Sequence, residues 1–273
     1  MKEQNPYNPI KAQLLEVVDE SSTIKTFVFS VDHGFSFATG QFVELLVPGL
    51  GEAPFTPSSN PAKSEKIDIT IMKVGKITSC LHAIKKGVEL GVRGPFGKGY
   101  PLEEFKGKQV YIVGGGVGLA PLRSLMFALL NEKSNYKKIL LRYGARSSDD
   151  IIYKNLVRDW QKSPDVDLKL TVDKGDQSWK DNVGVVTTIL DKKDVDIKNA
   201  VGVVCGPPIM MKFATLKLLE MGFKDSQLYL SMEKNMSCGF GKCGHCRIGD
   251  FYCCKDGPVF SYDKIKNFPE IWD

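Results

Sequence analysis

From residue 109 to residue 232 the chain alternates short apolar runs with segments of helical period. The apolar runs occupy residues 109–113, 137–144, 167–173, 200–206 and 227–232. Helical patterns lie between them, at residues 120–133, 149–162, 185–193 and 207–222. Parallel strands need long crossovers, usually helices, so this alternation predicts a parallel, doubly wound sheet. We expect this α/β domain to span residues 104–232.

The first hundred residues follow a two-residue period instead. In residues 26–31, the apolar side chains of Phe27, Phe29 and Val31 alternate with Thr26, Val28 and Ser30, and turn-forming residues recur every 8–15 positions. This pattern predicts an antiparallel sheet or small barrel, with one helix at residues 78–86. We expect the barrel to span residues 1–103, because the polar segment 103–108 separates the two patterns.

The remaining residues, 233–273, hold five of the seven cysteines within seventeen positions. The segment is too small and too poor in apolar periodicity to fold on its own hydrophobic core. No apolar run is long enough for a signal peptide or a membrane span, which predicts a cytoplasmic protein. Thiols stay reduced in that compartment, so the cysteines are expected to bind metal rather than form disulfides.

The spacing of the cysteines narrows the choice of metal. Cys238, Cys243 and Cys246 have the C-x4-C-x2-C spacing of plant-type 2Fe-2S ferredoxins, which add a distant fourth cysteine. Four thiolates would also satisfy structural zinc, although zinc sites more often use two CxxC pairs. The fourth ligand is Cys253 or Cys254, and these neighbours point to opposite faces if they lie in a strand.

Four glycines, Gly114, Gly115, Gly116 and Gly118, lie between the first strand and the first helix of the α/β pattern. Glycines let the backbone approach a pyrophosphate, and a helix N-terminus favours its charge. A strict GxGxxG is not present, because Leu119 stands where the third glycine would fall, so a tight turn without a ligand is the alternative.

A second loop, CGPP, follows the fourth strand of the α/β pattern. Its Cys205, Gly206 and Pro207 fall at the carboxyl edge of the sheet, where open α/β sheets bind ligands. We expect this loop to share a crevice with the glycine loop. The simpler interpretation of Cys205 is an ordinary buried thiol.

These motifs together resemble a known family. A β-rich first half followed by GGGVGLAP, YGAR and CGPPIMM is similar to the ferredoxin-NADP reductase superfamily. The cysteine-rich tail narrows the resemblance to FAD/2Fe-2S electron-transfer subunits, namely those of NAD(P)-linked soluble hydrogenases (sulfhydrogenase gamma) and of anaerobic sulfite reductase. The electron-transfer subunit of dihydroorotate dehydrogenase is a more distant likeness.

The resemblance assigns two flavin motifs. The family's GxxT/S motif is present from Gly75 to Thr78, where a helix start would face the FAD diphosphate. Its RxYS motif is replaced by Ala53-Pro54-Phe55-Thr56, in which Phe55 can stack on the flavin and Thr56 can hydrogen-bond near its N5. The missing cation would be supplied by Arg93.

The resemblance also selects Cys254 as the fourth cluster ligand, because in these subunits that ligand immediately precedes a KDGP-like turn. Cys253 is then a small apolar filler. The nicotinamide is NADH or NADPH: an acidic residue such as Asp173 after a strand favours a free ribose hydroxyl, whereas Arg146 or Lys174 would suit a 2′-phosphate. We expect NADH.

The implied function is electron transfer between a nicotinamide, FAD and a 2Fe-2S cluster, to or from a hydrogenase or anaerobic sulfite reductase subunit. No catalytic side chain beyond the cofactors is expected. The alternatives are a stand-alone NAD(P)H:ferredoxin-type reductase, a dihydroorotate dehydrogenase-type subunit and a non-catalytic scaffold with a zinc-folded tail. The net charge of +5 comes from dispersed lysines, so no nucleic-acid partner is expected.

Overall fold

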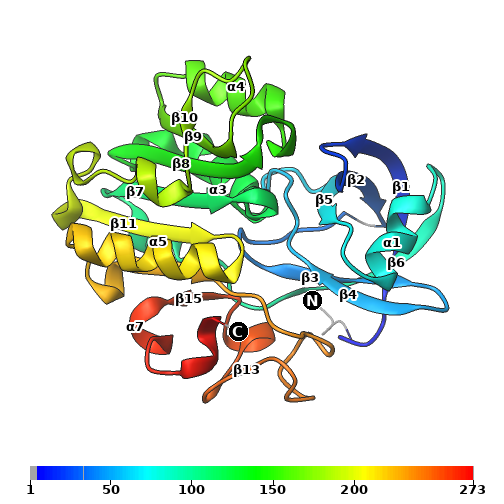
Figure 1. The fold of residues 1–273 in the computed structure, drawn as a ribbon. Helices are drawn as coiled ribbons and strands as arrows, with labels where there is room; N and C mark the ends of the chain where they lie inside the picture. The colour runs from blue at the N-terminus through cyan, green and yellow to red at the C-terminus, as the bar shows by residue number, and fades with distance from the viewer. Residues whose placement is uncertain (1–4, 33, 273) are drawn as a thin grey trace.

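The computed structural model describes residues 5–32 and 34–272 of the chain. A sheet of six antiparallel strands forms one lobe, and a seven-stranded, mainly parallel sheet with helices on its faces forms the other (Figure 1). The C-terminal tail lies against both lobes. No helix among the described residues is long and apolar enough to cross a membrane.

The first lobe is the expected barrel. Its strands are β1 (Ile10–Asp19), β2 (Ile24–Val31), β3 (Phe42–Val47), β4 (Gly51–Phe55), β5 (Lys66–Met72) and β6 (Glu89–Phe96). They pair in the order β4-β3-β6-β1-β2-β5, and a bridge between Pro57 and Ile69 joins the two edges. The inward side chains Phe27 and Phe29 are fully buried. The helix α1 (Lys76–Ala83) begins two residues before the predicted start.

The second lobe confirms the parallel sheet. Its strands are β7 (Gln109–Gly115), β8 (Lys138–Ser147), β9 (Val166–Lys174), β10 (Asn182–Val183), β11 (Ala200–Cys205) and β12 (Leu228–Ser231). With β15 (Val259–Ser261) of the tail, the order is β10-β9-β8-β7-β11-β12-β15, so the chain runs outward from β7 to β10 and then returns to β11. The strand order therefore reverses beside β7, where open α/β sheets bind ligands.

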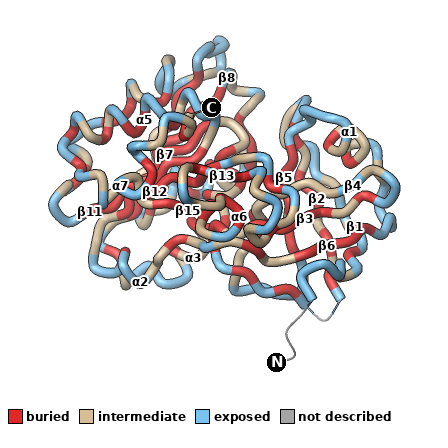
Figure 2. The backbone as a smooth tube through the Cα atoms, turned by 90° about the horizontal axis from the view of Figure 1, so that it is seen from below, coloured by how far each residue is buried: buried red, intermediate tan, exposed pale blue. Residues whose placement is uncertain are grey.

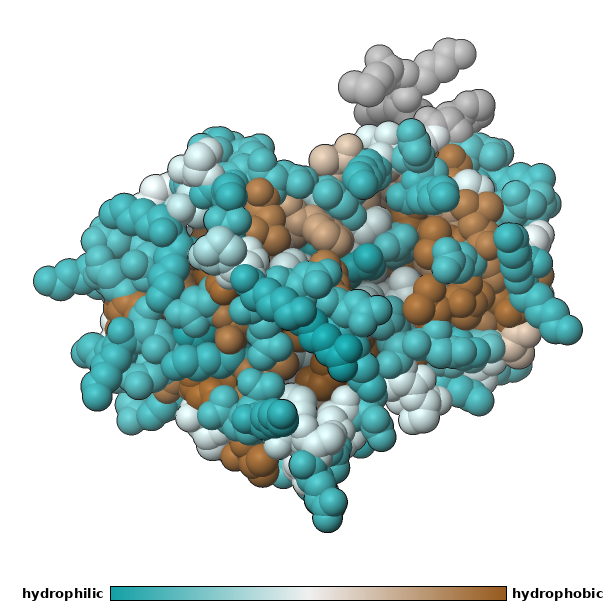
Figure 3. Space-filling model, turned by 90° about the horizontal axis from the view of Figure 1, so that it is seen from above, coloured by the Kyte–Doolittle hydropathy of each residue, from teal (hydrophilic) through white to brown (hydrophobic). Residues whose placement is uncertain are grey.

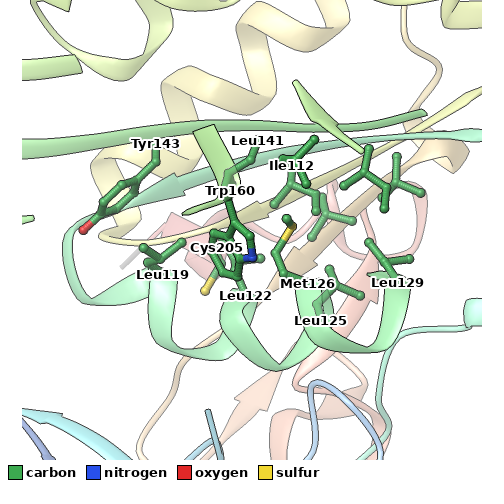
Figure 4. Packing of buried hydrophobic residues seen from close by; sticks show 14 of the residues in the cluster. Ile112, Leu119, Leu122, Leu125, Met126, Leu129, Leu141, Tyr143, Trp160 and Cys205 are labelled. Carbon is green, nitrogen blue, oxygen red and sulfur yellow. The ribbon is translucent and has the colours of Figure 1, made fainter. Parts of the chain in front are cut away.

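Helices cover both faces of this sheet. The helices are α2 (Leu102–Phe105), α3 (Leu119–Asn131), α4 (Lys154–Lys162) and α5 (Pro208–Met221). Leu122, Leu125 and Leu129 point from α3 toward the strands (Figure 4) and are fully buried. The tube view shows that burial concentrates in strands such as β7 and β12 (Figure 2).

The predicted helix over residues 185–193 is wrong. The chain there forms two short 3₁₀ turns, Val186–Ile189 and Lys192–Asp194. The five consecutive residues 185–189 are β-branched, and such side chains lose rotamer freedom in an α-helix. The helix predicted from residue 149 also begins later, because Tyr153 has a left-handed backbone and α4 starts at Lys154.

The tail contains β13 (Arg247–Ile248), β14 (Phe251–Tyr252), α6 (Cys253–Asp256), β15 (Val259–Ser261) and α7 (Tyr262–Ile265). Strand β15 pairs antiparallel with β12 and so extends the sheet of the α/β lobe. Ile248, Phe260 and Ile265 are buried in the same hydrophobic cluster as the α5 face of that sheet. The tail therefore shares a core with its neighbour, consistent with its having too few apolar residues for a core of its own.

Candidate nucleotide and iron-sulfur sites

A cavity of about 890 Å³ lies at the carboxyl ends of β7, β8 and β9. Five residues named from the sequence line it: Gly115, Gly116, Arg146, Asp173 and Pro207. The glycine loop, the end of β8 and the CGPP loop thus meet at the reversal of strand order. On the opposite side the cavity is lined by barrel residues Thr23, Ile24 and Met72.

The four glycines of the loop have different functions. Gly116 has φ +54°, and a Cβ there would meet no atom within 4 Å, so the backbone is open to a ligand. A Cβ at Gly118 would lie 2.6 Å from the carbonyl oxygen of Cys205, and one at Gly114 would lie 2.8 Å from Leu122. These two glycines let the loop pack against β11 and α3. Gly115 lies between them, and its Cβ would be 3.1 Å from Met210.

Cys205 ends β11 and is 6% exposed. Burial raises the pKa of its thiol to about 12, so the sulfur stays protonated at neutral pH. Its carbonyl faces Gly118, and the next residue, Gly206, has φ +156° and approaches Gly115. The CGPP loop is therefore packed directly on the glycine loop, which agrees with the expectation that the two loops border one crevice.

Charged side chains of both signs reach the rim of the cavity. Arg146, Asp150 and Asp173 lie where β8 and β9 end, and Lys217 and Glu220 extend from α5. Arg146 and Asp173 are both exposed, so each can meet a ribose at this rim. The structure brings together the two residues that the sequence offered as opposite indicators of nicotinamide type.

The flavin motifs lie on the barrel. Pro54 and Phe55 end β4, Thr56 follows, and all three are half-buried. At the start of α1 the Thr78 hydroxyl accepts hydrogen bonds from the N–H groups of Val74 (2.9 Å) and Gly75 (2.8 Å). A Cβ on Gly75 would meet nothing within 4 Å, so this helix start faces open space and fits a diphosphate.

Large hydrophobic side chains are exposed on the same lobe. Figure 3 shows a broad hydrophobic area on the right of the upper face, over the barrel. The exposed large hydrophobic residues of the barrel include Val18, Met72, Val74 and Val88. Met72 and Val74 lie three residues and one residue before the GxxT motif, so an apolar ring system bound there would cover otherwise exposed surface.

Arg93 is not placed as the resemblance suggested. Its guanidinium pairs with both carboxylate oxygens of Glu52 and donates to the carbonyls of Pro6 (2.7 Å) and Cys238 (3.3 Å). The residue is 5% exposed. Its donors therefore join the barrel to the segment 238–254, which we call the cysteine loop, and are not directed at a flavin phosphate.

The cysteine loop directs backbone N–H groups at three sulfurs. Lys242 donates to Cys238 (3.2 Å), Gly241 to Cys254 (3.1 Å), and Cys254 itself to Cys246 (3.4 Å). Such N–H···S bonds stabilise thiolates and tune iron-sulfur clusters. Among the described residues no three metal-ligating side chains already form a compact metal site. The fit to a cluster therefore depends on these hydrogen bonds and on the course of the loop.

The two neighbouring cysteines differ in direction. Both are fully buried, but the Cys253 thiol donates to the carbonyl of Met232 (3.5 Å), away from the loop sulfurs. The Cys254 sulfur accepts from Gly241 inside the loop. The geometry favours Cys254 over Cys253 as a ligand.

The Cys238 thiol is held in an environment that favours the thiolate. Burial raises the pKa of Cys238, yet hydrogen bonds from the N–H groups of residues 240, 242 and 243 outweigh burial and lower this pKa to about 6.

Glu44 is a buried carboxylate near Arg93 and Cys238 that the sequence reasoning missed. It lies in β3 opposite Arg93 and Pro54, is 0% exposed, and neither carboxylate oxygen has a hydrogen-bond partner. Burial raises its pKa from 4.5 to about 8, although Arg93 opposes the shift. A charged residue within the apolar run FVELLV was the available signal.

Comparison with known protein families assigns all three regions. Residues 11–100 match an oxidoreductase FAD-binding domain, and residues 112–215 match an oxidoreductase NAD-binding domain. Residues 233–266 match the iron-sulfur cluster binding domain of dihydroorotate dehydrogenase B. These matches confirm the predicted cofactor classes.

Relatives that align over nearly the whole chain support the same assignment. The gamma subunit of sulfhydrogenase 2 from Pyrococcus furiosus is 34% identical, over 94% of this chain and 96% of its own length. A probable electron-transfer subunit of dihydroorotate dehydrogenase B from Methanocaldococcus jannaschii is also 34% identical, over 96% and 93%. The chain belongs to this family of electron-transfer subunits. Its relatives are components of multi-subunit redox enzymes, which confirms the predicted oxidoreductase class.

Solved structures confirm the fold. A chain of the NADH-dependent reduced ferredoxin-NADP oxidoreductase, studied for flavin-based electron bifurcation, superposes with a TM-score of 0.74 at 28% identity. It covers 98% of this chain and 94% of its own. The cytochrome b5 reductase domain of Ulva prolifera nitrate reductase shares the fold, with a TM-score of 0.68 at 23% identity over 83% of this chain and 97% of its own.

Proposed function

We propose that this subunit carries electrons between NADH and a hydrogenase partner, through FAD and a 2Fe-2S cluster. The observation that carries the proposal is the cavity between the glycine loop and the barrel. One wall is the open backbone of Gly116 and the other is formed by Ile24 and Met72. A nicotinamide dinucleotide held by the first wall would reach the lobe that carries the flavin motifs.

The residues of the chain would act by binding and orienting. Gly116 and the start of α3 would hold the pyrophosphate, and Asp173 would bond the ribose hydroxyls. Phe55 would stack on the flavin ring, Thr56 would bond near its N5, and the start of α1 at Gly75 and Thr78 would receive its diphosphate. When bound, the flavin and the cluster supply the hydride and single-electron chemistry.

The protonated Cys205 thiol has a packing and shielding role in this scheme. It ends β11 as the first residue of the CGPP loop, and Pro207 of that loop borders the cavity. Burial keeps its sulfur neutral and limits its reactivity toward oxidants. Water would be excluded from the space between the two walls by the apolar side chains of Ile24, Met72 and Met210.

Four cysteines would hold the cluster: Cys238, Cys243, Cys246 and Cys254. The N–H···S bonds of the loop support this choice, and so does the turn of Cys253 toward Met232. Cys243 is exposed, which suits an electron exit toward another subunit. We also propose the boundaries 1–103, 104–232 and 233–273 and a cytoplasmic location, in keeping with seven free thiols.

An anaerobic titration of the purified protein tests the proposal. Iron, zinc and flavin contents should be near two, zero and one per chain, with visible flavin and iron-sulfur absorption. NADH should bleach the flavin faster than NADPH does. A colourless protein that contains zinc would refute the redox function and leave the scaffold alternative.

The partner is tested separately by co-purification from the source cells under anaerobic conditions. We expect hydrogenase subunits, because two sulfhydrogenase gamma subunits match the chain at 34% and 33% identity over nearly its whole length. Recovery of a dihydroorotate dehydrogenase or sulfite reductase subunit would replace the hydrogenase in the proposal. A fully active protein with no partner would indicate a stand-alone reductase.

A further inference from the structure

A continuous group of buried polar side chains lies where the barrel meets the α/β lobe. Within the barrel, the hydroxyl of Thr70 lies 2.9 Å from that of Thr26 and 3.1 Å from that of Ser58. The α/β lobe contributes one more hydroxyl, because Tyr153 hydrogen-bonds to the same Thr70. All four residues are at most 7% exposed. The contact is therefore shielded from water, and the loss of a hydrogen bond in such a buried place is costly.

The backbone of Tyr153 is unusual and is fixed by the barrel. Among the described residues it is the one non-glycine residue with positive φ (φ +54°, ψ +40°). This conformation is unfavourable for a bulky side chain and persists where surrounding contacts impose it. Here the N–H of Tyr153 donates to Glu20 (2.8 Å), whose other carboxylate oxygen accepts from Thr26 (2.7 Å).

A third contact holds the face of the tyrosine ring. The guanidinium of Arg123 lies 4.6 Å from the ring centroid of Tyr153 and pairs with Asp68 at 2.8 Å. Arg123 belongs to α3 and Asp68 to β5, so this pair crosses the same boundary between lobes. Cation–π and ion-pair contacts are stronger in such partly desolvated places. The ring, hydroxyl and backbone of Tyr153 are thus all held at this boundary.

Each part of this group continues into a proposed cofactor site. Ser58 follows Thr56 of the flavin motif by two residues, and Arg123 stands on the helix that starts at the glycine loop. Tyr153 ends the segment from Arg146 that also carries Asp150, and both of these line the cavity. Movement at Tyr153 would therefore shift the nicotinamide wall relative to the flavin motif.

We propose that Tyr153 is a positioning residue that sets the alignment of the nicotinamide with the flavin. The inference deepens the proposed function and rests on it. Hydride transfer needs the reacting atoms about 3–3.5 Å apart, so a small displacement of one lobe slows it strongly while leaving binding of the remote part of the dinucleotide intact. A residue that only stabilised the fold would not separate those two quantities.

The test compares Tyr153→Phe with Tyr229→Phe in the holoprotein. Tyr229 is also buried, and its hydroxyl donates to Glu104 (3.0 Å) without involving the barrel. In Tyr153→Phe we expect flavin reduction at saturating NADH to slow by about tenfold or more, and the nicotinamide–flavin charge-transfer band to weaken. The dissociation constant of ADP-ribose, which lacks the nicotinamide, should stay within about twofold. The control should change none of these.

A second measurement does not depend on electron transfer. Backbone hydrogen exchange in the first turn of α4 and in β5 should accelerate by roughly fivefold to tenfold in Tyr153→Phe, for the loss of one buried hydrogen bond. Thr70→Val removes the same bond from the barrel side, together with the Thr70 bonds to Thr26 and Ser58, so it should change exchange and rate at least as much, even if Tyr153→Phe does not fold.

Two results would overturn the inference: flavin reduction at the wild-type rate in Tyr153→Phe and Thr70→Val, or an equal loss in Tyr229→Phe. A wild-type protein whose flavin neither NADH nor NADPH reduces would instead overturn the proposed function. In that case exchange at α4 and β5 alone decides whether Tyr153 holds the lobes together. Unchanged exchange there would exclude that role as well.

Discussion

The cavity at the carboxyl edge of the parallel sheet and the cysteine loop both depend on glycines, but the two regions are held in different ways. Behind the cavity wall at Gly115 and Gly116, Gly118 is packed against the end of β11, since its Cβ would lie 2.6 Å from the Cys205 carbonyl oxygen. The strands β7 and β11 beneath it pair over six registered positions. In the cysteine loop, Gly239, Gly241 and Gly244 have φ values of +89°, +78° and +85°. They turn the backbone in a segment whose nearest strands, β13 and β14, have two residues each.

The two regions differ in the interactions that fix the course of the backbone. The cavity wall is defined by packed backbone, which exists before any ligand binds. The cysteine loop is defined by N–H···S bonds to thiols, and a cluster would join those thiols covalently. Metal-ligand bonds contribute directly to folding in such segments. Loss of the ligand should therefore change the loop more than the cavity.

Removal of a cluster thiol should give the largest effect. Cys254→Ser takes away a buried sulfur that accepts from Gly241, so we expect nearly complete loss of bound iron and of the visible cluster absorption. Cys253→Ser should retain the cluster, because that thiol faces Met232. Iron analysis and the visible spectrum of both proteins check this. The opposite result for the pair would mean that Cys253 is the ligand.

Glycine substitutions test the cavity side of the comparison. Gly118→Ala places a methyl against the backbone of β11, so we expect a loss of about 2–3 kcal/mol of stability and NADH binding that is at least tenfold weaker. Gly116→Ala meets no neighbour within 4 Å and should cost about 1 kcal/mol for its positive φ. Thermal unfolding and NADH titration measure both. Equal losses of stability in the two variants would contradict the packed-backbone account of the wall.

Most of the fold could be predicted from the sequence because its periods are strong. Alternation of two residues predicted the barrel, and strand-helix alternation predicted the parallel sheet. The failure at residues 185–193 came from interpreting an apolar, β-branched segment by its spacing alone. Strand β4 was not predicted, because its sequence GEAPF contains glycine and proline and its pairing with β3 is a tertiary choice.

Some of the site residues could also be predicted from the sequence, and others could not. Gly116, Arg146, Asp173 and Pro207 were expected at one cavity, and the structure places them there, because the carboxyl ends of parallel strands meet at one edge. The partners of Arg93 could not be anticipated, since Pro6, Glu52 and Cys238 are distant from it in the sequence. Spacing within a motif carries no information about contacts between distant segments.

Titration of Glu44, which lies near the cysteine loop, should make the free energy of unfolding depend on pH. Its folded-state pKa of about 8 exceeds the ordinary value of 4.5, so the folded protein holds a proton that the unfolded chain releases between those values. The stability contribution of that proton is present below pH 4.5 and is lost as pH rises through 8. Glu44→Gln cannot titrate, so relative to pH 5 it should gain about 4 kcal/mol of stability over the wild type at pH 8.5. Melting temperatures at the two pH values measure this. Parallel pH profiles would show that Glu44 is ionised in the folded protein.

The smallest effect is expected at the exposed rim of the cavity. Asp173 and Arg146 both line it and both are exposed, so each charge is screened by water and should alter binding by about twofold to fivefold. Asp173→Asn should shift the ratio of kcat/KM values toward NADPH, and Arg146→Gln should shift it toward NADH. Neither change should lower the melting temperature, because the wall beneath is held by backbone packing. A rim variant that also destabilised the fold would show that the cavity depends on its side chains, as the cysteine loop does on its thiols.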